Sequence, residues 1–227
     1  MRPRVKICGI RRLEDAALAC ELGADAVGFV FWPESPRFID PYRARRIVSL
    51  LPPFVTPVGV FVNQPADHVA AVAGVARLGA VQLHGDELLG PFDRSPLRII
   101  KAVAVTDGFD PESALAGLPA RVTVLLDAHD PIRRGGTGQS IDWKLAAGAS
   151  RIRPIALSGG LTADNVGEAI TEVNPYAIDV SSGVESAPGV KDGRALRRFF
   201  EAVHQASHAT MADRLNPSRL VESRELL

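Results

Sequence analysis

Short apolar runs recur at fairly even intervals along the 227 residues of this chain. Most of them are rich in Val, Ile and Phe, a composition typical of parallel strands that are buried on both faces. The runs span residues 5–8, 26–32, 57–62, 80–83, 98–105, 122–127, 154–157 and 176–181. Their polar residues lie mainly at the C-terminal end. The pattern therefore predicts eight buried strands that end in polar side chains.

Amphipathic or alanine-rich stretches lie between these runs and predict helices. The clearest span residues 13–22, 41–51, 65–76, 162–170 and 193–206. Gly23 follows the first as a C-cap, Pro65 opens the third, and Thr162 caps the fourth. Weaker helical patterns follow the fourth and fifth runs, over residues 86–92 and 111–118.

A strand followed by a helix, repeated along one chain, fits either an open doubly wound sheet or a closed barrel. Eight near-equal units favour the barrel, and no Gly-x-Gly-x-x-Gly motif of a dinucleotide-binding open sheet follows the first strand. The length also suits a barrel, which typically has about 250 residues. We therefore predict an α/β fold, a single-domain parallel (β/α)8 TIM barrel over residues 1–206. A polar C-terminal tail follows over 207–227, in which a short helix could begin at Pro217.

Active sites of such barrels are built at the C-terminal ends of the strands. Side chains two apart in a strand share a face, so one choice of phase turns a set of polar side chains toward a common mouth. The opposite phase would bury them unpaired in the strand–helix layer, at a cost of roughly several kcal/mol. The residues gathered at the mouth are Lys6, Cys8, Gln82, His84, Asp127, Asp179 and Ser181. Strands 8 and 1 are neighbours in a closed barrel, so Lys6 and Asp179 are expected to form an inner ion pair.

Two turns rich in glycine and serine follow the last two strands. Glycine lets backbone N–H groups approach an anion closely, and the loops after strands 7 and 8 are the usual phosphate site of these barrels. The predicted phosphate-binding residues are Gly159, Gly160, Ser181, Ser182 and Gly183.

Bulk charge excludes several classes of partner. The chain has 26 basic and 26 acidic residues, which argues against nucleic acid, and no run approaches the roughly 18 apolar residues of a membrane span. Cys8 and Cys20 are its two cysteines, without metal-type spacing, so a reduced, cytoplasmic protein with no metal and no cofactor is expected. Assembly is expected to be monomer or homodimer.

Several motifs occur in order from Lys6 to about Val203. They are Lys-Ile-Cys-Gly at 6–9, Gly-Phe-Val-Phe at 28–31 with Ser-Pro-Arg at 35–37, Gly-Val-Phe-Val-Asn at 59–63, Gln-Leu-His-Gly at 82–85, Leu-Asp at 126–127, Gly-Gly-Thr-Gly at 135–138 with Asp-Trp at 142–143, Leu-Ser-Gly-Gly-Leu at 157–161, and Asp-Val-Ser-Ser-Gly-Val-Glu at 179–185. Together they resemble the phosphoribosylanthranilate isomerase family of tryptophan biosynthesis. Gln139 stands where the family commonly has a basic residue, and Ile141 where it usually has Phe.

The resemblance implies an Amadori rearrangement of a small phosphosugar, N-(5-phosphoribosyl)anthranilate, to 1-(2-carboxyphenylamino)-1-deoxyribulose 5-phosphate. It assigns the base to Cys8, the acid to Asp127 and the anthranilate carboxylate to Arg37. Gln82 and His84 are expected to contact the substrate. A thiol base is expected to titrate near neutrality, below its free value of about 8.5, which Lys6 or dipoles of the substrate site could bring about.

Plainer readings of the same residues stay open. Cys8 could be a small core residue, Asp127 a helix cap or ion-pair partner, Arg37 a surface charge, and His84 an inner histidine satisfied by its neighbours. The Gly-rich stretch at 135–138 is either a flexible loop or one that folds over the substrate.

Three rival functions also stay open. A barrel similar to thiamine-phosphate synthase is one, and a barrel similar to ribulose-phosphate epimerase is another. The epimerase would need metal-binding His and Asp at several strand ends, whereas only strand 4 offers His. A catalytically inactive phosphate-binding barrel is the third.

Overall fold

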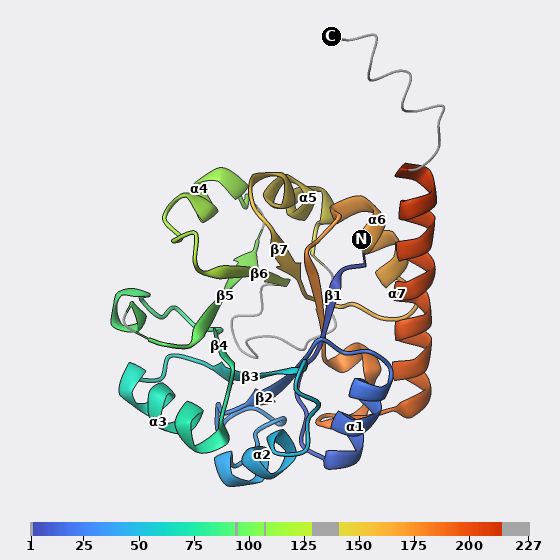
Figure 1. Ribbon diagram of the computed structural model, residues 1–227. Helices are drawn as coiled ribbons and strands as arrows, with labels where there is room; N and C mark the ends of the chain where they lie inside the picture. The colour runs from blue at the N-terminus through green and yellow to red at the C-terminus, as the bar shows by residue number, and fades with distance from the viewer. Residues whose placement is uncertain (1, 94, 107, 129–140, 215–227) are drawn as a thin grey trace.

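The predicted runs form parallel strands that pair in sequence order, and the eighth strand pairs with the first to close the sheet. The computed structural model describes residues 2–93, 95–106, 108–128 and 141–214, without the side chains of 210–214. Within this part of the chain the barrel has eight strands, and helices surround it (Figure 1). The predicted (β/α)8 TIM barrel is confirmed.

The strands agree with the predicted runs to within a few residues. They are β1 (Arg4–Ile7), β2 (Ala26–Val30), β3 (Thr56–Phe61), β4 (Ala80–Leu83), β5 (Arg98–Val105), β6 (Thr123–Ala128), β7 (Ile155–Leu157) and β8 (Ala177–Val180). A small antiparallel hairpin, β9 (Glu185–Ala187) with β10 (Val190–Lys191), follows β8.

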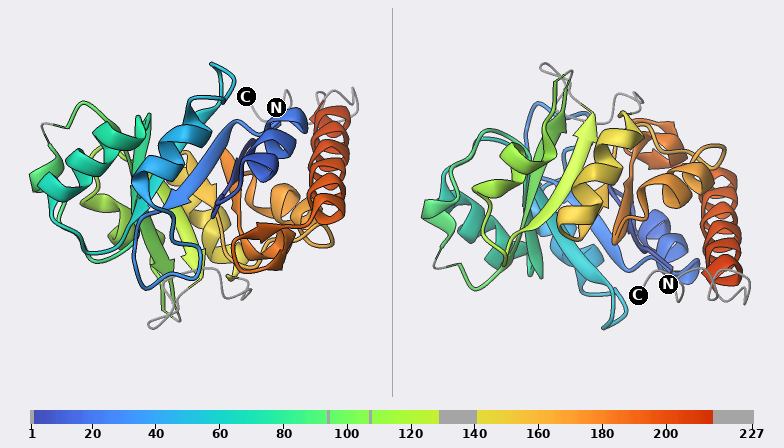
Figure 2. Two further views of the ribbon diagram at one scale, coloured as in Figure 1. Left: turned by 90° about the horizontal axis from the view of Figure 1, so that it is seen from below. Right: turned by 90° about the horizontal axis from the view of Figure 1, so that it is seen from above.

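The helices that surround the barrel are α1 (Leu13–Glu21), α2 (Pro41–Val48), α3 (Ala66–Ala76), α4 (Pro111–Ala116), α5 (Trp143–Ile152), α6 (Val166–Val173) and α7 (Gly193–Arg214). Two short 3-10 turns, η1 (Gly90–Phe92) and η2 (Ser182–Val184), complete the described elements. Figure 2 shows α7, in red, along one side of the barrel. In the described part of the chain, no helix has both the length and the apolar character needed to cross a membrane.

Local chemistry sets where several helices begin. Asp40 accepts hydrogen bonds from the N–H groups of Tyr42 and Arg43 at the start of α2. Asp110 and Asp142 cap α4 and α5 in the same way. Aspartate at this position satisfies N–H groups that have no partner within the helix, and its charge suits the positive end of the helix dipole.

The predicted alternation along the strands is confirmed. The outward residues pack in the apolar layer between strands and helices; they include Val5, Ile7, Val81, Leu83, Leu126, Ile178 and Val180. Their polar neighbours in the same strands point into the barrel instead. Burying the apolar set against the helices therefore fixes which side chains reach the mouth.

The segment after β4 differs from its prediction. A helix was expected over residues 86–92, but only the turn η1 forms there. The Glu87 carboxylate accepts hydrogen bonds from the N–H groups of Asn63 and Gly85 and from Lys101 Nζ. These contacts tie the loop to Asn63 just after β3 and to Lys101 within β5, and they draw its polar groups away from a helix.

Two further helix predictions need correction, and one helix was not predicted. The fourth helix begins at Val166 rather than Thr162, because residues 162–165 form a turn in which Asn165 Oδ1 accepts a hydrogen bond from the Thr162 N–H. Helix α5 was not among the predicted helices. Helix α7 continues past residue 206 to Arg214. The short helix predicted from Pro217 lies outside the described residues.

The expected ion pair at the barrel seam is present. Lys6 and Asp179 are register partners on β1 and β8, and Lys6 Nζ lies 2.9 Å and 3.0 Å from the two carboxylate oxygens of Asp179. Burial lowers the pKa of Lys6, but attraction to Asp179 and Cys8 outweighs burial, so this pKa is raised. The charged pair thus lies inside the barrel, just below the mouth.

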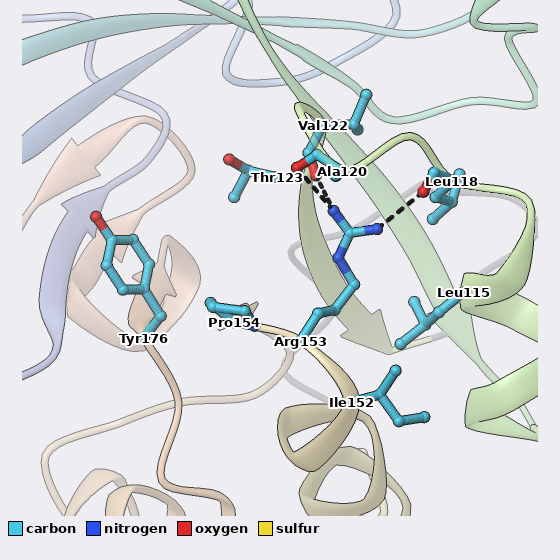
Figure 3. A pocket seen from close by; sticks show the side chains of 9 residues that line it. All are labelled: Leu115, Leu118, Ala120, Val122, Thr123, Ile152, Arg153, Pro154 and Tyr176. Atoms are coloured by element: carbon cyan, nitrogen blue, oxygen red, sulfur yellow. Dashed lines mark hydrogen bonds between the residues drawn. The ribbon is translucent and has the colours of Figure 1, made fainter.

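Arg153 binds the loop between α4 and β6 at the opposite end of the barrel. Its guanidinium lies in a pocket of about 600 Å³ at the N-terminal ends of β6 and β7 (Figure 3). It donates hydrogen bonds to the carbonyl groups of Leu118, Pro119, Ala120 and Val122. One cation therefore organises the α4–β6 loop, and its donors are used within the protein.

Replacing Arg153 by Met should lower the free energy of unfolding by about 1.5–3 kcal/mol, because the loop carbonyls lose a charged donor. Arg151→Met, at an exposed position nearby in α5, is the matched control and should change stability by less than about 0.5 kcal/mol. Denaturant unfolding of both variants measures the difference. Equal stability of the two variants would contradict the role given to Arg153.

Candidate active site

A cavity of about 620 Å³ opens at the C-terminal ends of the strands. The predicted site residues that line it are Cys8, Arg37, Gln82, His84, Asp127 and Ser181. The other predicted residues do not line it; they are Gly159, Gly160, Ser182 and Gly183. Gly159 and Gly160 directly follow Ser158 in the sequence, and Ser182 and Gly183 directly follow Ser181. Both serines line the cavity.

Cys8 sits against an apolar wall of this cavity. Its side chain packs with Val30, Val60 and Trp32 in a cluster separate from the main core, and the residue is 8% exposed. Burial raises the pKa of the Cys8 thiol because a thiolate is poorly solvated there. Attraction to Lys6 and Lys191 lowers this pKa but does not overcome burial.

The lowered thiol pKa expected from the sequence is therefore wrong for this structure. The nearby lysines do lower the pKa of Cys8, but burial of the thiolate raises it by more. Each lysine also pairs with a carboxylate, since Lys6 Nζ contacts Asp179 and Lys191 Nζ contacts Glu185. Cys8 is consequently a thiol that is protonated at neutral pH and a strong proton acceptor once ionised.

Asp127 ends a row of three polar side chains across β4 and β6. Gln82 Nε2 lies 2.9 Å from His84 Nδ1, and His84 Nε2 lies 3.1 Å from Asp127 Oδ2. With Gln82 as donor, Nδ1 accepts and Nε2 carries the proton toward Asp127. His84 is thus satisfied by its neighbours and also lines the cavity. Gln82 Oε1 is buried and has no hydrogen-bond partner among the described residues.

Arg37 reaches the cavity from the loop after β2, and it is not a plain surface charge. Its Nε and Nη2 atoms form a bidentate ion pair with the Glu185 carboxylate, at 2.7–3.1 Å. Lys191 Nζ lies 2.8 Å from the same carboxylate. Burial raises the pKa of Glu185, but Arg37 and Lys191 outweigh it, so this pKa is lowered.

Glu185 and Lys191 hold Arg37 in the site but were not predicted from the sequence. Glu185 closes the last quoted motif, which was the only signal available for it. Lys191 comes beside Glu185 only because the β9–β10 hairpin pairs the two positions. The sequence does not show that pairing.

The two predicted phosphate turns have the backbone features that the prediction requires. Gly159 and Gly160 adopt positive φ angles of 90° and 62°, and a Cβ at Gly183 would collide with the carbonyl oxygen of Leu161. The β7 and β8 turns therefore approach each other closely. The backbone N–H groups of the turns donate no hydrogen bond to another described residue. These are the N–H groups of Gly159, Gly160, Ser182 and Gly183.

Two predicted features of the site, the Gly-rich stretch 135–138 and Gln139, lie outside the described residues. Across the described ranges, no group of three or more His, Cys, Asp or Glu side chains could hold a metal ion.

The protein is a parallel (β/α)8 barrel with a polar cavity at its C-terminal mouth, and the turns after β7 and β8, beside that cavity, have backbone N–H groups that are unpaired within the described part of the chain. These features define the class of TIM-barrel enzymes that act on phosphorylated ligands. Within that class, the sequence model of the N-(5'-phosphoribosyl)anthranilate (PRA) isomerase family matches residues 5–202. The chain belongs to this family.

Individual relatives support the same family. The N-(5'-phosphoribosyl)anthranilate isomerase of Geobacter sulfurreducens is 51% identical over 200 residues, which cover 87% of this chain and 96% of that protein. A crystal structure of a family member in complex with reduced 1-(o-carboxyphenylamino)-1-deoxyribulose 5-phosphate has a TM-score of 0.79 and 45% identity, covering 89% of this chain and 99% of that one. Monomers generated from the dimeric Thermotoga maritima enzyme give a TM-score of 0.79 and 43% identity, with the same coverage.

The predicted family is therefore confirmed, and with it the prediction that the protein is an isomerase of tryptophan biosynthesis. The family assignment favours this activity over the synthase-like, epimerase-like and inactive alternatives. The individual roles of the site residues stay predictions.

The raised pKa of Cys8 can be measured by alkylation. In a Cys20→Ser background, the rate of iodoacetamide modification should reach half of its maximum above the free-thiol value of about pH 8.5, because only the thiolate reacts. Alkylation of a small free thiol under the same conditions is the control. A half-maximal rate below that pH would show that the lysines outweigh burial.

Proposed function

We propose that this chain catalyses the Amadori rearrangement of N-(5'-phosphoribosyl)anthranilate, with Asp127 as the acid and Cys8 as the base. The observation that carries the proposal is that a thiol and a carboxyl from strands on different sides of the barrel line one cavity. Its volume of about 620 Å³ suits a small phosphorylated ligand. A substrate lying between β1 and β6 can meet both groups.

Asp127 acts first in this proposal. Its protonated carboxyl gives a proton to the ribose ring oxygen, the bond from that oxygen to the first carbon breaks, and the anthranilate nitrogen supplies electrons to form the protonated Schiff base. Asp127 is left as a carboxylate. The His84 ring, whose Nε2 lies 3.1 Å from Asp127 Oδ2, stabilises that charge electrostatically.

Cys8 acts second. Once the Cys8 thiol has given its own proton to solvent, the thiolate removes the proton from the second carbon of the sugar. The electrons of that C–H bond form a double bond to the first carbon, and the electrons of the C=N double bond move onto the nitrogen and neutralise it. The resulting enolamine becomes the aminoketose when a proton is added at the first carbon and the enol gives up its hydroxyl proton. Lys6 and Lys191 favour the thiolate electrostatically. The positive charge on the substrate's iminium adds to this attraction, which helps to offset the burial of Cys8.

The remaining cavity residues support substrate binding. Arg37 is suited to the anthranilate carboxylate, since a guanidinium binds such a group with two parallel hydrogen bonds. Trp32, Val30 and Val60 provide an apolar wall for the aromatic ring. The unpartnered Oε1 of Gln82 can accept a hydrogen bond from a sugar hydroxyl.

The phosphate is assigned to the turns after β7 and β8, at Gly159, Gly160, Ser181, Ser182 and Gly183. Their backbone N–H groups supply the donors that a phosphate needs. A cytoplasmic location, the absence of a nucleic-acid partner, and assembly as monomer or homodimer stay predictions.

Cys8→Ser and Asp127→Asn should each lower turnover by at least about 10²-fold, because each removes one of the two proton transfers. Serine keeps the shape of the site but its hydroxyl does not ionise near neutrality, and asparagine cannot donate the carboxyl proton. Turnover, followed by anthranilate-type fluorescence, and the thermal midpoint are measured together.

Cys20→Ser is the matched control for the cysteine change and should keep its turnover. Near-full activity in Cys8→Ser would remove Cys8 from the role of base. A loss of activity that only follows a loss of thermal stability would likewise show that the variants act through folding.

A further inference from the structure

Arg37 has two edges that can each hold a carboxylate, and the protein occupies one of them. A guanidinium has five N–H donors in a rigid plane, with one fork at Nε and Nη2 and another at Nη1 and Nη2. Glu185 takes the first fork, at 3.0 Å from Nε and 2.7 Å from Nη2. Nη1 donates no hydrogen bond to any described residue. The second fork is therefore available to a ligand.

The Glu185 carboxylate is itself held firmly. It is 4% exposed, and its Oε1 accepts hydrogen bonds from Lys191 Nζ at 2.8 Å and from the Gly189 N–H at 3.2 Å. The Lys191 side chain is fully buried and also donates to the carbonyl oxygen of Ser181. Through Glu185 and Lys191, the β9–β10 hairpin therefore fixes the Arg37 guanidinium relative to the end of β8.

The other side of Arg37 is fixed by close packing. A Cβ at Gly9 would lie 2.7 Å from Arg37 Cδ, so the arginine stem passes directly over the backbone at the end of β1. Formal charges also fit a further anion: Arg37 and Lys191 are cations and Glu185 is an anion. The trio carries one excess positive charge, which a single carboxylate would neutralise.

We propose that Glu185 is a positioning residue that sets specificity for the substrate's aromatic carboxylate by holding Arg37 with its Nη1–Nη2 edge toward the cavity. The inference rests on the proposed function, in which Arg37 binds that carboxylate. Glu185 does not touch the substrate. Its effect passes through the orientation of Arg37, and the cost of ordering the long arginine side chain is met before the substrate arrives.

The test compares two substrates, each formed by condensing ribose 5-phosphate with an amine. One is the anthranilate compound and the other is the aniline compound, which lacks the carboxylate. Glu185→Gln should raise KM for the anthranilate compound about tenfold, since one charge-assisted bidentate contact of Arg37 is lost, and leave kcat nearly unchanged. KM for the aniline compound should stay the same, which also shows that the variant is folded.

Coupling to Arg37 is tested in the same assay. In an Arg37→Ala background, Glu185→Gln should cause no further rise in KM, because the side chain through which it acts is absent. Glu201→Gln is the charge-matched control, since Glu201 is an exposed carboxylate on α7 that does not line the cavity and has no contact to Arg37. It removes a negative charge without disturbing the arginine, so it should not raise KM.

Several outcomes would overturn the proposal. These are an unchanged or lower KM in Glu185→Gln, an equal rise for both substrates, an equal rise without Arg37, or an equal rise in Glu201→Gln. If Glu185→Gln does not fold, Glu185→Asp carries the same test, because its shorter carboxylate keeps the charge near Lys191 but withdraws from Arg37. If Arg37→Ala itself leaves KM for the anthranilate compound unchanged, the carboxylate role of Arg37 in the proposed function fails instead.

Discussion

The buried ion pair between Lys6 and Asp179 is the contact on which the arrangement of the site depends. It joins β1 and β8 where the barrel closes, and the two side chains are only 8% and 6% exposed. Removing one partner of such a pair typically costs about 3–5 kcal/mol, because the other charge is left buried. The pair therefore resists any shift of register at the seam. Since side chains two apart share a face, it also turns Cys8 and Ser181 toward the cavity.

The mouth combines two different environments that suit two different proton transfers. Cys8 lies among Val30, Val60 and Trp32, where burial raises its pKa and makes it a strong base once ionised. Asp127 lies in a polar row with His84, whose Nε2 is close enough to stabilise electrostatically the carboxylate left after proton donation. A third region, around Arg37, holds the positive charge that an anionic substrate requires. The barrel positions all three from separate strand ends.

Much of the fold could be predicted from the sequence, because it follows from local rules. A strand alternates every second residue, so the phase that buried Val5 and Ile7 also placed Lys6 and Cys8. Helix starts at Pro41 and Pro111 could be predicted because proline favours the first turn of a helix, a rule that acts locally. The loop over 86–92 was not predicted correctly, because Glu87 bonds to residues brought near only by the barrel. The pairing of Glu185 with Lys191 depends on a hairpin, and the direction of the Cys8 pKa depends on burial, which a sequence does not reveal.

The central claim is that Asp127 opens the sugar ring and Cys8 then removes the proton from the second carbon. The primary isotope effect on turnover, with substrate deuterated at that carbon, tests this order most directly in the Asp127→Asn and Cys8→Ser variants. Slow ring opening in Asp127→Asn should hide the C–H step and bring the effect close to unity. Slow proton removal in Cys8→Ser should express it fully. A large effect in Asp127→Asn together with none in Cys8→Ser would contradict the assignment.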